Sequence, residues 1–269
     1  MFTRTSLLPT KILGVIGFII VITINTLANT LPINGKTTGE ISDMYPNLFV
    51  PAGLTFAIWG VIYLFLLMYT LYQTGIFTKH SSREIERIRG IGGLYFLSCI
   101  ANAAWILCWH YNMILASVAV MLVLLITLIL IYNKTRLGKA ASNKEKVFLS
   151  APFSLYLGWI TVATIANITA FLVSIGWNAL GIDPEYWTVA VIVVAVIITL
   201  IVQKLHRDVL FSSVVIWAFI GIVIRHVDTY KSQYPIIIST VGLGIIVVFI
   251  GAIFMSLKRR ARSNYFSNY

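Results

Sequence analysis

The chain has 269 residues, of which 59% are hydrophobic and only 11% are charged, and its formal net charge is +11. A soluble globular domain has about 25% charged residues, so this composition excludes one. The positive charge could indicate a nucleic-acid partner. Its distribution along the sequence, described below, instead favours a membrane surface and no nucleic acid.

Eight apolar stretches follow one another along the chain, and none of the 20 basic or 9 acidic side chains lies in them. About 20 apolar residues cross the ~30 Å hydrocarbon core as a helix, which satisfies every backbone polar group without water. The sequence therefore predicts an all-α fold: a polytopic membrane helical bundle of about eight transmembrane helices, with the lipid bilayer as its partner. The predicted spans are residues 12–30, 49–77, 91–109, 113–132, 147–175, 186–202, 209–224 and 235–257.

The basic residues predict the orientation of the chain. If the eight spans alternate in direction, 17 of the 20 Lys and Arg residues lie on one side of the membrane. Only Lys36, Arg225 and Lys231 lie on the other side. Lys and Arg mark the cytoplasmic side. We therefore expect a multi-pass integral membrane protein with both termini in the cytoplasm, in the cell membrane if the chain is prokaryotic.

The first span has a second interpretation. Arg4 and Lys11 precede an apolar core, and small residues follow near Ala28, as in a signal peptide. Cleavage there would leave seven helices and an external N-terminus. The apolar run is longer than the ~7–15 residues of a signal-peptide core, so we expect the helix to be retained.

Four of the first five spans carry a polar or aromatic stripe at helical spacing, so that the members of each stripe share one face. In the expected orientation the stripes lie in the outer half of the membrane, beneath the segment 31–48, which is rich in turn-forming residues. An aromatic cavity with a few amides suits a flat, mostly apolar ligand. The stripes are Asn25 and Asn29; Phe56, Trp59 and Tyr63, after Pro51; Ser98, Asn102, Trp105 and Trp109; and Trp159, Ala163 and Asn167, with Thr164 beside them.

Plainer interpretations exist for single residues. Trp near a helix end usually belongs to the interfacial belt, and we expect this of Trp177 and Trp187. An Asn in a membrane helix more often joins two helices, at ~0.6–2 kcal/mol, than contacts a ligand. His110 has no Cys, Asp or Glu near it in sequence, so no metal site is expected. No nucleophile–base pair is visible, so no catalytic residue is assigned.

Three stripes resemble motifs of the translocator-protein family (TspO/MBR, the tryptophan-rich sensory proteins). Residues 56–63, FAIWGVIY, are similar to its second-helix F-x-x-W-x-x-L-Y pattern. Residues 102–105, NAAW, resemble its third-helix N-x-x-W. Residues 159–167, WITVATIAN, resemble its fifth-helix W-x-x-x-A-T-x-x-N. The three motifs occur in the family's order and on the matching spans, so together they are specific although each alone is weak.

The resemblance implies a five-helix TspO-like membrane domain at residues 1–177, followed by a three-helix membrane extension at 178–269 with a basic cytoplasmic tail. It also implies a pocket for porphyrins, sterols or synthetic aromatic ligands. No cofactor is expected beyond a bound porphyrin or other tetrapyrrole. With the stripes, the expected ligand-binding residues are Asn25, Pro51, Phe56, Trp59, Tyr63, Asn102, Trp105, Trp159, Ala163, Thr164 and Asn167.

The chain departs from the family pattern in places. Ala52 stands where the family has the second proline of a pair, and Leu54 stands where it has a tryptophan. Pro152 lies seven residues before Trp159 instead of four, so the start of the fifth helix should differ.

The three added spans are typical of the family's larger relatives. They could cover the surface through which five-helix relatives dimerise or form a separate interface, and a homodimer is a candidate assembly. Gly244 and Gly251, one heptad apart, predict close packing of helices in this region.

We therefore expect a membrane protein that binds a tetrapyrrole, sterol or isoprenoid-like molecule in a sensory or carrier role. The alternative is a facilitative transporter of a small hydrophobic molecule, although the sequence shows no inverted repeat and no charge within its spans. A third hypothesis is an enzyme acting on a lipid or tetrapyrrole, because porphyrin degradation has been suggested for the family. The sequence does not decide whether the protein is an enzyme.

Overall fold

A computed structural model describes residues 7–31, 33–77, 79–136 and 142–267, with side chains up to residue 257. Within these ranges the chain is all-α, and eight helices are long and apolar enough to cross a membrane. This confirms the predicted polytopic helical bundle. The spanning helices are α1 (Leu8–Thr30), α3 (Ile58–Thr74, preceded by the 3-10 turn η2, Gly53–Ala57), α4 (Ser82–His110), α5 (Ile114–Thr135), α7 (Ala151–Ser174), α8 (Pro184–His206), α9 (Val209–Asp228) and α10 (Pro235–Ser267).

Two helices begin where the sequence supplies a capping box. The α4 helix begins nine residues before the predicted span, because Ser81 and Glu84 form a reciprocal capping box at its first turn. The same device starts the short helix α2 (Thr38–Asp43), with Thr37 and Glu40 as the pair. These polar first turns extend or add helices that hydropathy alone does not predict.

The start of the fifth span has an irregular turn before its proline. The short helix α6 (Asn143–Glu145) leads into a π-helical turn, η3 (Lys146–Ser150), which directly precedes α7. Pro152 lacks the N–H that would continue regular helical bonding, and a π turn is one way for a helix to accommodate such a break. The position of Pro152 therefore coincides with an irregular start of α7, and that this start differs from the family pattern stays a prediction.

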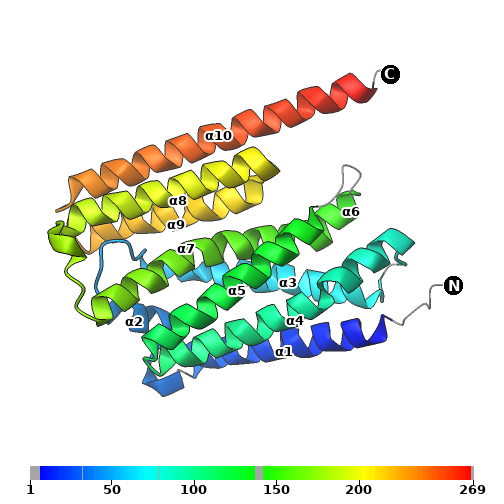
Figure 1. Cartoon of the computed structure of the whole chain (residues 1–269), viewed down its shortest axis with the longest axis horizontal. Coiled ribbons are helices and arrows are strands. Elements are labelled where there is room, and N and C mark those ends of the chain that lie inside the picture. Colours follow the sequence, from blue (N-terminus) through cyan, green and yellow to red (C-terminus); the bar gives the residue numbers. More distant parts are fainter. Residues whose placement is uncertain (1–6, 32, 78, 137–141, 268–269) are drawn as a thin grey trace. The chain divides into compact units, whose positions relative to one another are not determined.

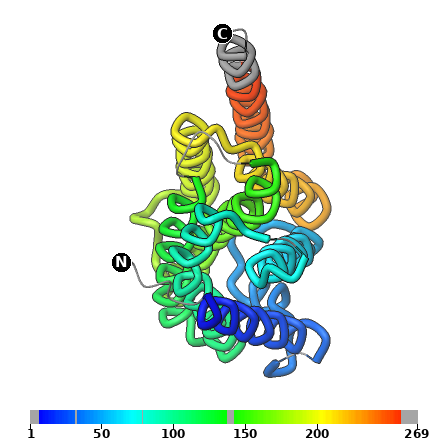
Figure 2. The backbone as a smooth tube through the Cα atoms, turned by 90° about the vertical axis from the view of Figure 1, so that its right-hand side faces the viewer, coloured from blue at the N-terminus to red at the C-terminus, as the bar shows by residue number. Residues whose placement is uncertain are grey.

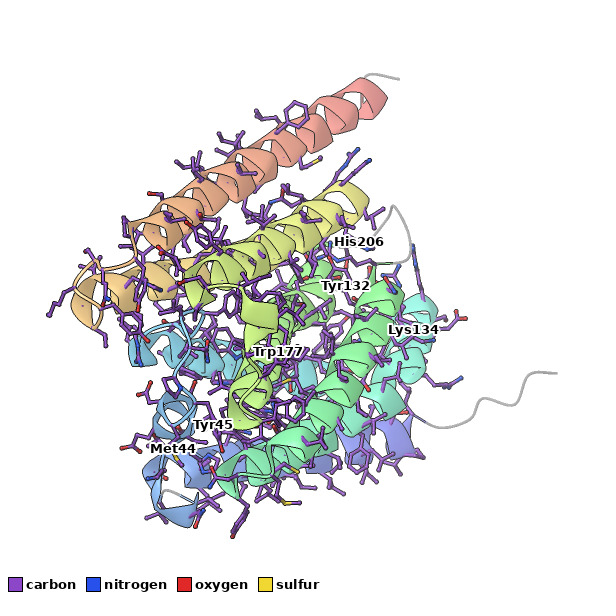
Figure 3. The ribbon with its side chains drawn as sticks, turned by 60° about the vertical axis from the view of Figure 1, so that its left-hand side comes forward. Met44, Tyr45, Tyr132, Lys134, Trp177 and His206 are labelled. Atoms are coloured by element: carbon purple, nitrogen blue, oxygen red, sulfur yellow. The ribbon has the colours of Figure 1, made fainter. Side chains whose placement is uncertain are left out.

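The packing groups the chain into two compact units. Unit 1 consists of Met1–Met44 and Ala57–Ile160, and unit 2 of Tyr45–Phe56 and Thr161–Tyr269. One division falls between Met44 and Tyr45, both labelled in Figure 3, and another falls inside α7. The boundary at residue 177, which rests on the family resemblance, stays a prediction.

In unit 1, α4 packs between α1 and α5, and α1 also contacts α3. The helices α1 and α4 lie side by side in both Figure 1 and Figure 2. Gly14 allows α1 to approach α3 closely, because a Cβ at this position would overlap the side-chain amide of Gln73. Tyr69, Tyr95 and Phe153 form a fully buried core through edge-to-face contacts, with ring centroids 4.8–5.9 Å apart.

In unit 2, α10 packs along both α8 and α9, as Figure 1 shows. The Gln203 amide nitrogen donates to Ser212 Oγ (3.0 Å) and to the carbonyl of Val248 (2.8 Å), so one side chain of α8 joins α9 and α10. Gly251 provides the space for this amide, and Gly244 lies directly against Phe219. The close packing predicted at the two glycines is confirmed.

The segment Tyr45–Phe56 packs on α9 within unit 2. The Trp217 indole N–H donates to the carbonyl of Thr55 (2.9 Å), and the N–H of Ala52 donates to the carbonyl of Gly221 (2.9 Å). At the other end, His226 Nε2 lies 2.9 Å from the carbonyl of Leu48. The added helices therefore hold the chain that leads into the second span, a role that their apolar sequence did not indicate.

Candidate functional site

Trp59, on the second turn of the second span, lies at the centre of an aromatic cluster in unit 1. Its ring stacks on Tyr63, with a centroid distance of 5.4 Å and an interplanar angle of 13°. Trp105 lies tilted against it at 6.3 Å. Tyr156 and Trp159 each meet it in a T-shaped arrangement, with centroids 6.1 Å away. We call these five residues of α3, α4 and α7 the Trp59 cluster.

Helical spacing places these rings together. Trp59 and Tyr63 are four residues apart on α3, and Tyr156 and Trp159 are three apart on α7, so each pair shares a face. All five side chains are at most 9% exposed. Ring pairs at these separations contribute about 0.5–1.5 kcal/mol each beyond their burial. The cluster is a packed set of rings that contact one another directly.

A chain of buried hydrogen bonds runs beside the rings. The Asn25 side chain on α1 donates to Asn102 Oδ1 on α4 (2.7 Å), and Asn102 Nδ2 donates to the Tyr156 hydroxyl (2.9 Å). The Asn25 amide also donates to the carbonyl of Val21 (2.9 Å). A polar side chain in an apolar interior requires such partners. These hydrogen bonds therefore join α1, α4 and α7 at the edge of the Trp59 cluster.

Tyr63 differs from its polar neighbours. Its side chain is 8% exposed, and its hydroxyl makes no hydrogen bond of normal geometry to the described residues, although Asn102 lies close enough to interact with it. Leaving a buried hydroxyl without a partner costs about 1–3 kcal/mol. The hydroxyl is thus a buried polar group that a bound molecule could satisfy.

The first part of the predicted covering loop lies on the end of α4. The Trp109 indole, which stacks on Trp105 at 5.9 Å, donates to the carbonyl of Thr38 (3.1 Å). His110 is fully buried, and its two ring nitrogens lie 2.9 Å from the carbonyl of Ile33 and 3.1 Å from Thr38 Oγ1. In this structure His110 therefore fastens the loop, and its ring nitrogens contact loop oxygens.

At the other end of unit 1, the chain between α3 and α4 meets the chain between α5 and α7. Arg87 pairs with Glu145 (2.5 Å). The Tyr72 hydroxyl donates to Glu84 (2.5 Å), and Lys144 Nζ lies 3.6 Å from the same carboxylate. Alternating spans place both connections at one end, and these contacts agree with that alternation.

His80 lies in the connection between α3 and α4 and is half-buried. Its Nε2 is 2.9 Å from the carbonyl of Tyr72, and its Nδ1 is buried with no partner among the described residues. Burial lowers the pKa of His80 from its ordinary value of 6.5, since a charged imidazole loses hydration there. The neutral ring is favoured near pH 7.

Comparison with known proteins decides the family. A profile of the family described as TSPO-like protein matches residues 11–254. The chain belongs to this TSPO-like family. The match extends through all eight spans, well beyond residue 177, so the three added helices are part of what the family shares. No curated protein and no solved structure matched the chain.

Six of the eleven predicted site residues of this TSPO-like protein lie in unit 1. Trp59, Tyr63, Trp105 and Trp159 belong to the Trp59 cluster, and Asn25 and Asn102 form the hydrogen-bond chain beside it. The other five residues belong to unit 2 and stay predictions. Of these, Pro51, Thr164 and Asn167 are buried, and Phe56 and Ala163 are half-buried.

Tyr156 is the member of the site that we did not predict from the sequence. It accepts a hydrogen bond from Asn102 and contacts Trp59. Tyr156 lies three residues before Trp159, on the face that also carries Ala163 and Asn167. If the predicted stripe of Trp159, Ala163 and Asn167 had been extended by one turn toward the start of α7, it would have included Tyr156.

Proposed function

We propose that this integral membrane protein of the TSPO-like family binds a planar, mostly apolar molecule at the Trp59 cluster. A tetrapyrrole, a sterol or an isoprenoid-like compound has the required chemistry. Its role would be sensory or carrier-like, with both termini in the cytoplasm. Membership of the family and eight spanning helices support the proposal at the level of the whole protein.

The rings of the cluster support a flat ligand. Trp59 stacks face to face on Tyr63 and makes T-shaped contacts with Tyr156 and Trp159. Replacing one ring contact by a ligand forfeits about 0.5–1.5 kcal/mol. Burial of the ligand's apolar surface returns about 25 cal/mol per Å². Association itself costs about 4–15 kcal/mol, so a flat apolar molecule can separate two rings at a net gain only if it buries roughly several hundred Å² of apolar surface.

The observation that carries the proposal is the position of the Tyr63 hydroxyl: it is buried within the Trp59 cluster and makes no hydrogen bond of normal geometry to the described residues, although Asn102 lies near it. Most buried polar groups are bonded. Tyr69 also lacks a bond of normal geometry but lies outside the Trp59 cluster, so the assignment rests on Tyr63 stacking against Trp59. A carbonyl, hydroxyl or carboxyl oxygen on the ligand would satisfy the Tyr63 hydroxyl. The ligand we infer thus has a flat apolar body and at least one polar group.

A pair of variants tests this assignment. Tyr63→Phe removes the hydroxyl in the cluster. Tyr69→Phe removes another buried hydroxyl without a described partner on the same helix, among Tyr95 and Phe153. With protoporphyrin IX or a sterol as the probe, we expect Tyr63→Phe to weaken binding about 2- to 10-fold, the value of one hydrogen bond. Tyr69→Phe should bind within about twofold of the unaltered protein. Equal affinities of all three proteins for both probes would contradict the assignment.

Identification of co-purifying molecules would name the ligand class. A Soret-type absorbance band, with a matching mass released on denaturation, would indicate a tetrapyrrole. Saturable flux of the same molecule across proteoliposomes would instead favour the transporter alternative. Binding without flux would favour the sensory or carrier role.

A further inference from the structure

Unit 2 contains a groove that the Trp59 cluster does not use. It has a volume of about 800 Å³ and lies between the first turns of α9 and the later turns of α10. Volumes of about 300–1,000 Å³ are typical of sites for small organic molecules. Both walls belong to the three-helix extension, so the groove is formed within one unit.

The walls of the groove are apolar and open to their surroundings. Phe249, Ile253 and Leu257 line one wall at 56%, 45% and 58% exposure. They repeat every four residues along α10 and so form one ridge. In a chain that crosses the membrane, side chains with this exposure face lipid tails. An acyl chain is the apolar partner that such a wall meets.

The polar end of the groove is formed by Arg207. This residue ends α8 in the left-handed conformation (φ 52°), and its N–H donates to the carbonyl of Gln203 (2.8 Å). Among the described residues that line the groove, none is acidic. The nearest acidic side chain in sequence, Asp208, accepts the N–H groups of Leu210 and Phe211 at the start of α9. Figure 3 labels His206, the residue just before Arg207.

The sequence adds positive charge at the same end of the helices. Lys204 lies in the last turn of α8, and Lys258, Arg259 and Arg260 directly follow Leu257 of the groove wall. Basic pockets between transmembrane helices on the positively charged side of a protein attract anionic lipid headgroups. The groove thus combines an apolar channel with Arg207 at one end, next to a basic stretch of the sequence.

We propose that this groove is a binding site for an anionic glycerophospholipid. One acyl chain would lie against the ridge of Phe249, Ile253 and Leu257, and the phosphate would lie beside the Arg207 guanidinium. Ser213 and Ser256, which line the groove, would contact the glycerol region. This site is separate from the Trp59 cluster, so it does not depend on the proposed function.

The test compares phosphatidylglycerol with phosphatidylcholine of identical acyl chains, added to the delipidated full chain in detergent and measured by native mass spectrometry. The unaltered protein should bind phosphatidylglycerol preferentially. Arg207→Gln and Arg207→Gly should each reduce that preference about fivefold, as expected for one cation near a phosphate. Glycine suits the left-handed conformation at this position, so Arg207→Gly should keep the fold while removing the charge. Arg207→Lys should retain the preference.

Two further variants separate the groove from general surface charge. Lys204→Gln removes a neighbouring cation that does not line the groove and should stay within about twofold of the unaltered protein. Ser213→Trp, at an exposed position of the wall, should reduce binding of both lipids by filling the groove. The proposal is overturned if Lys204→Gln loses as much preference as Arg207→Gln. It is also overturned if Ser213→Trp binds both lipids as well as the unaltered protein does. A third contradicting result would be a dimer of the unaltered protein that Ser213→Trp dissociates, because a second copy of the chain would then cover the groove.

Discussion

Gly251 should be a position at which a single added methyl group loosens the three-helix extension. A Cβ there would overlap Gln203 Oε1 and lie 3.3 Å from its Cδ, so the amide must rotate. Rotation would break the bonds from Gln203 to Ser212 and Val248. Two such bonds contribute together about 1–3 kcal/mol. Ala is about 1 kcal/mol better than Gly in a helix, so the net destabilisation should be about 0–2 kcal/mol.

The matched control is Gly242→Ala on the same helix, where a Cβ would meet no atom within 4 Å. That variant should stabilise the protein by up to about 1 kcal/mol through helix propensity alone. The assay is unfolding in mixed micelles, followed by far-UV circular dichroism. In a Gln203→Ala background, Gly251→Ala should behave like Gly242→Ala, because its clash partner is gone. Equal stabilisation by both glycine substitutions in the unaltered background would refute the reasoning.

Three other predictions follow from the described contacts. His110→Ala removes the contacts to Ile33 and Thr38 and should speed labelling or proteolysis of the segment 33–44; unchanged rates would show that His110 does not fasten the loop. The pKa of His80 is lower in the folded protein than in the unfolded chain, so below about pH 6.5 the unfolded chain binds more protons than the folded protein. The free energy of unfolding should therefore be at its full value above that pH and fall as the pH drops. His80→Gln should reduce this dependence. If both termini are cytoplasmic, a cysteine at Thr37 and one at Ser263 should be labelled from opposite sides of the membrane, and labelling of both from one side would contradict the orientation.

The sequence predicted those features of the fold that depend on local physical chemistry. Uninterrupted apolar runs of about 20 residues have one stable form in a bilayer, so the eight spans could be located from hydropathy alone. Stripe spacing likewise brought Asn25, Asn102 and Trp59 to one region, because helical periodicity fixes which side chains share a face. Gly251 marked close packing for a related reason, since a residue without a side chain lets two helices approach.

Features that depend on contacts between distant residues could not be predicted in this way. Nothing in the segment 45–56 indicates that Thr55 and Leu48 will contact Trp217 and His226, which lie 162 and 178 residues later. The bonds from Gln203 to two other helices could not be predicted either, since a glutamine at the end of an apolar run gives no sign of its partners. The packing of the helices determines which of these polar side chains contact each other.

The central claim is that the Trp59 cluster, and not tryptophan in general, binds a planar ligand. The most direct measurement is the affinity for protoporphyrin IX, from its absorbance shift, of Trp59→Leu and Trp187→Leu. Trp187 packs edge-on against Trp177 at 4.9 Å in unit 2 and lies outside the cluster. Loss of the central indole should weaken binding at least about tenfold, which corresponds to ~1.4 kcal/mol, whereas Trp187→Leu should bind within about twofold of the unaltered protein. Equal affinity of the two folded variants would contradict the claim.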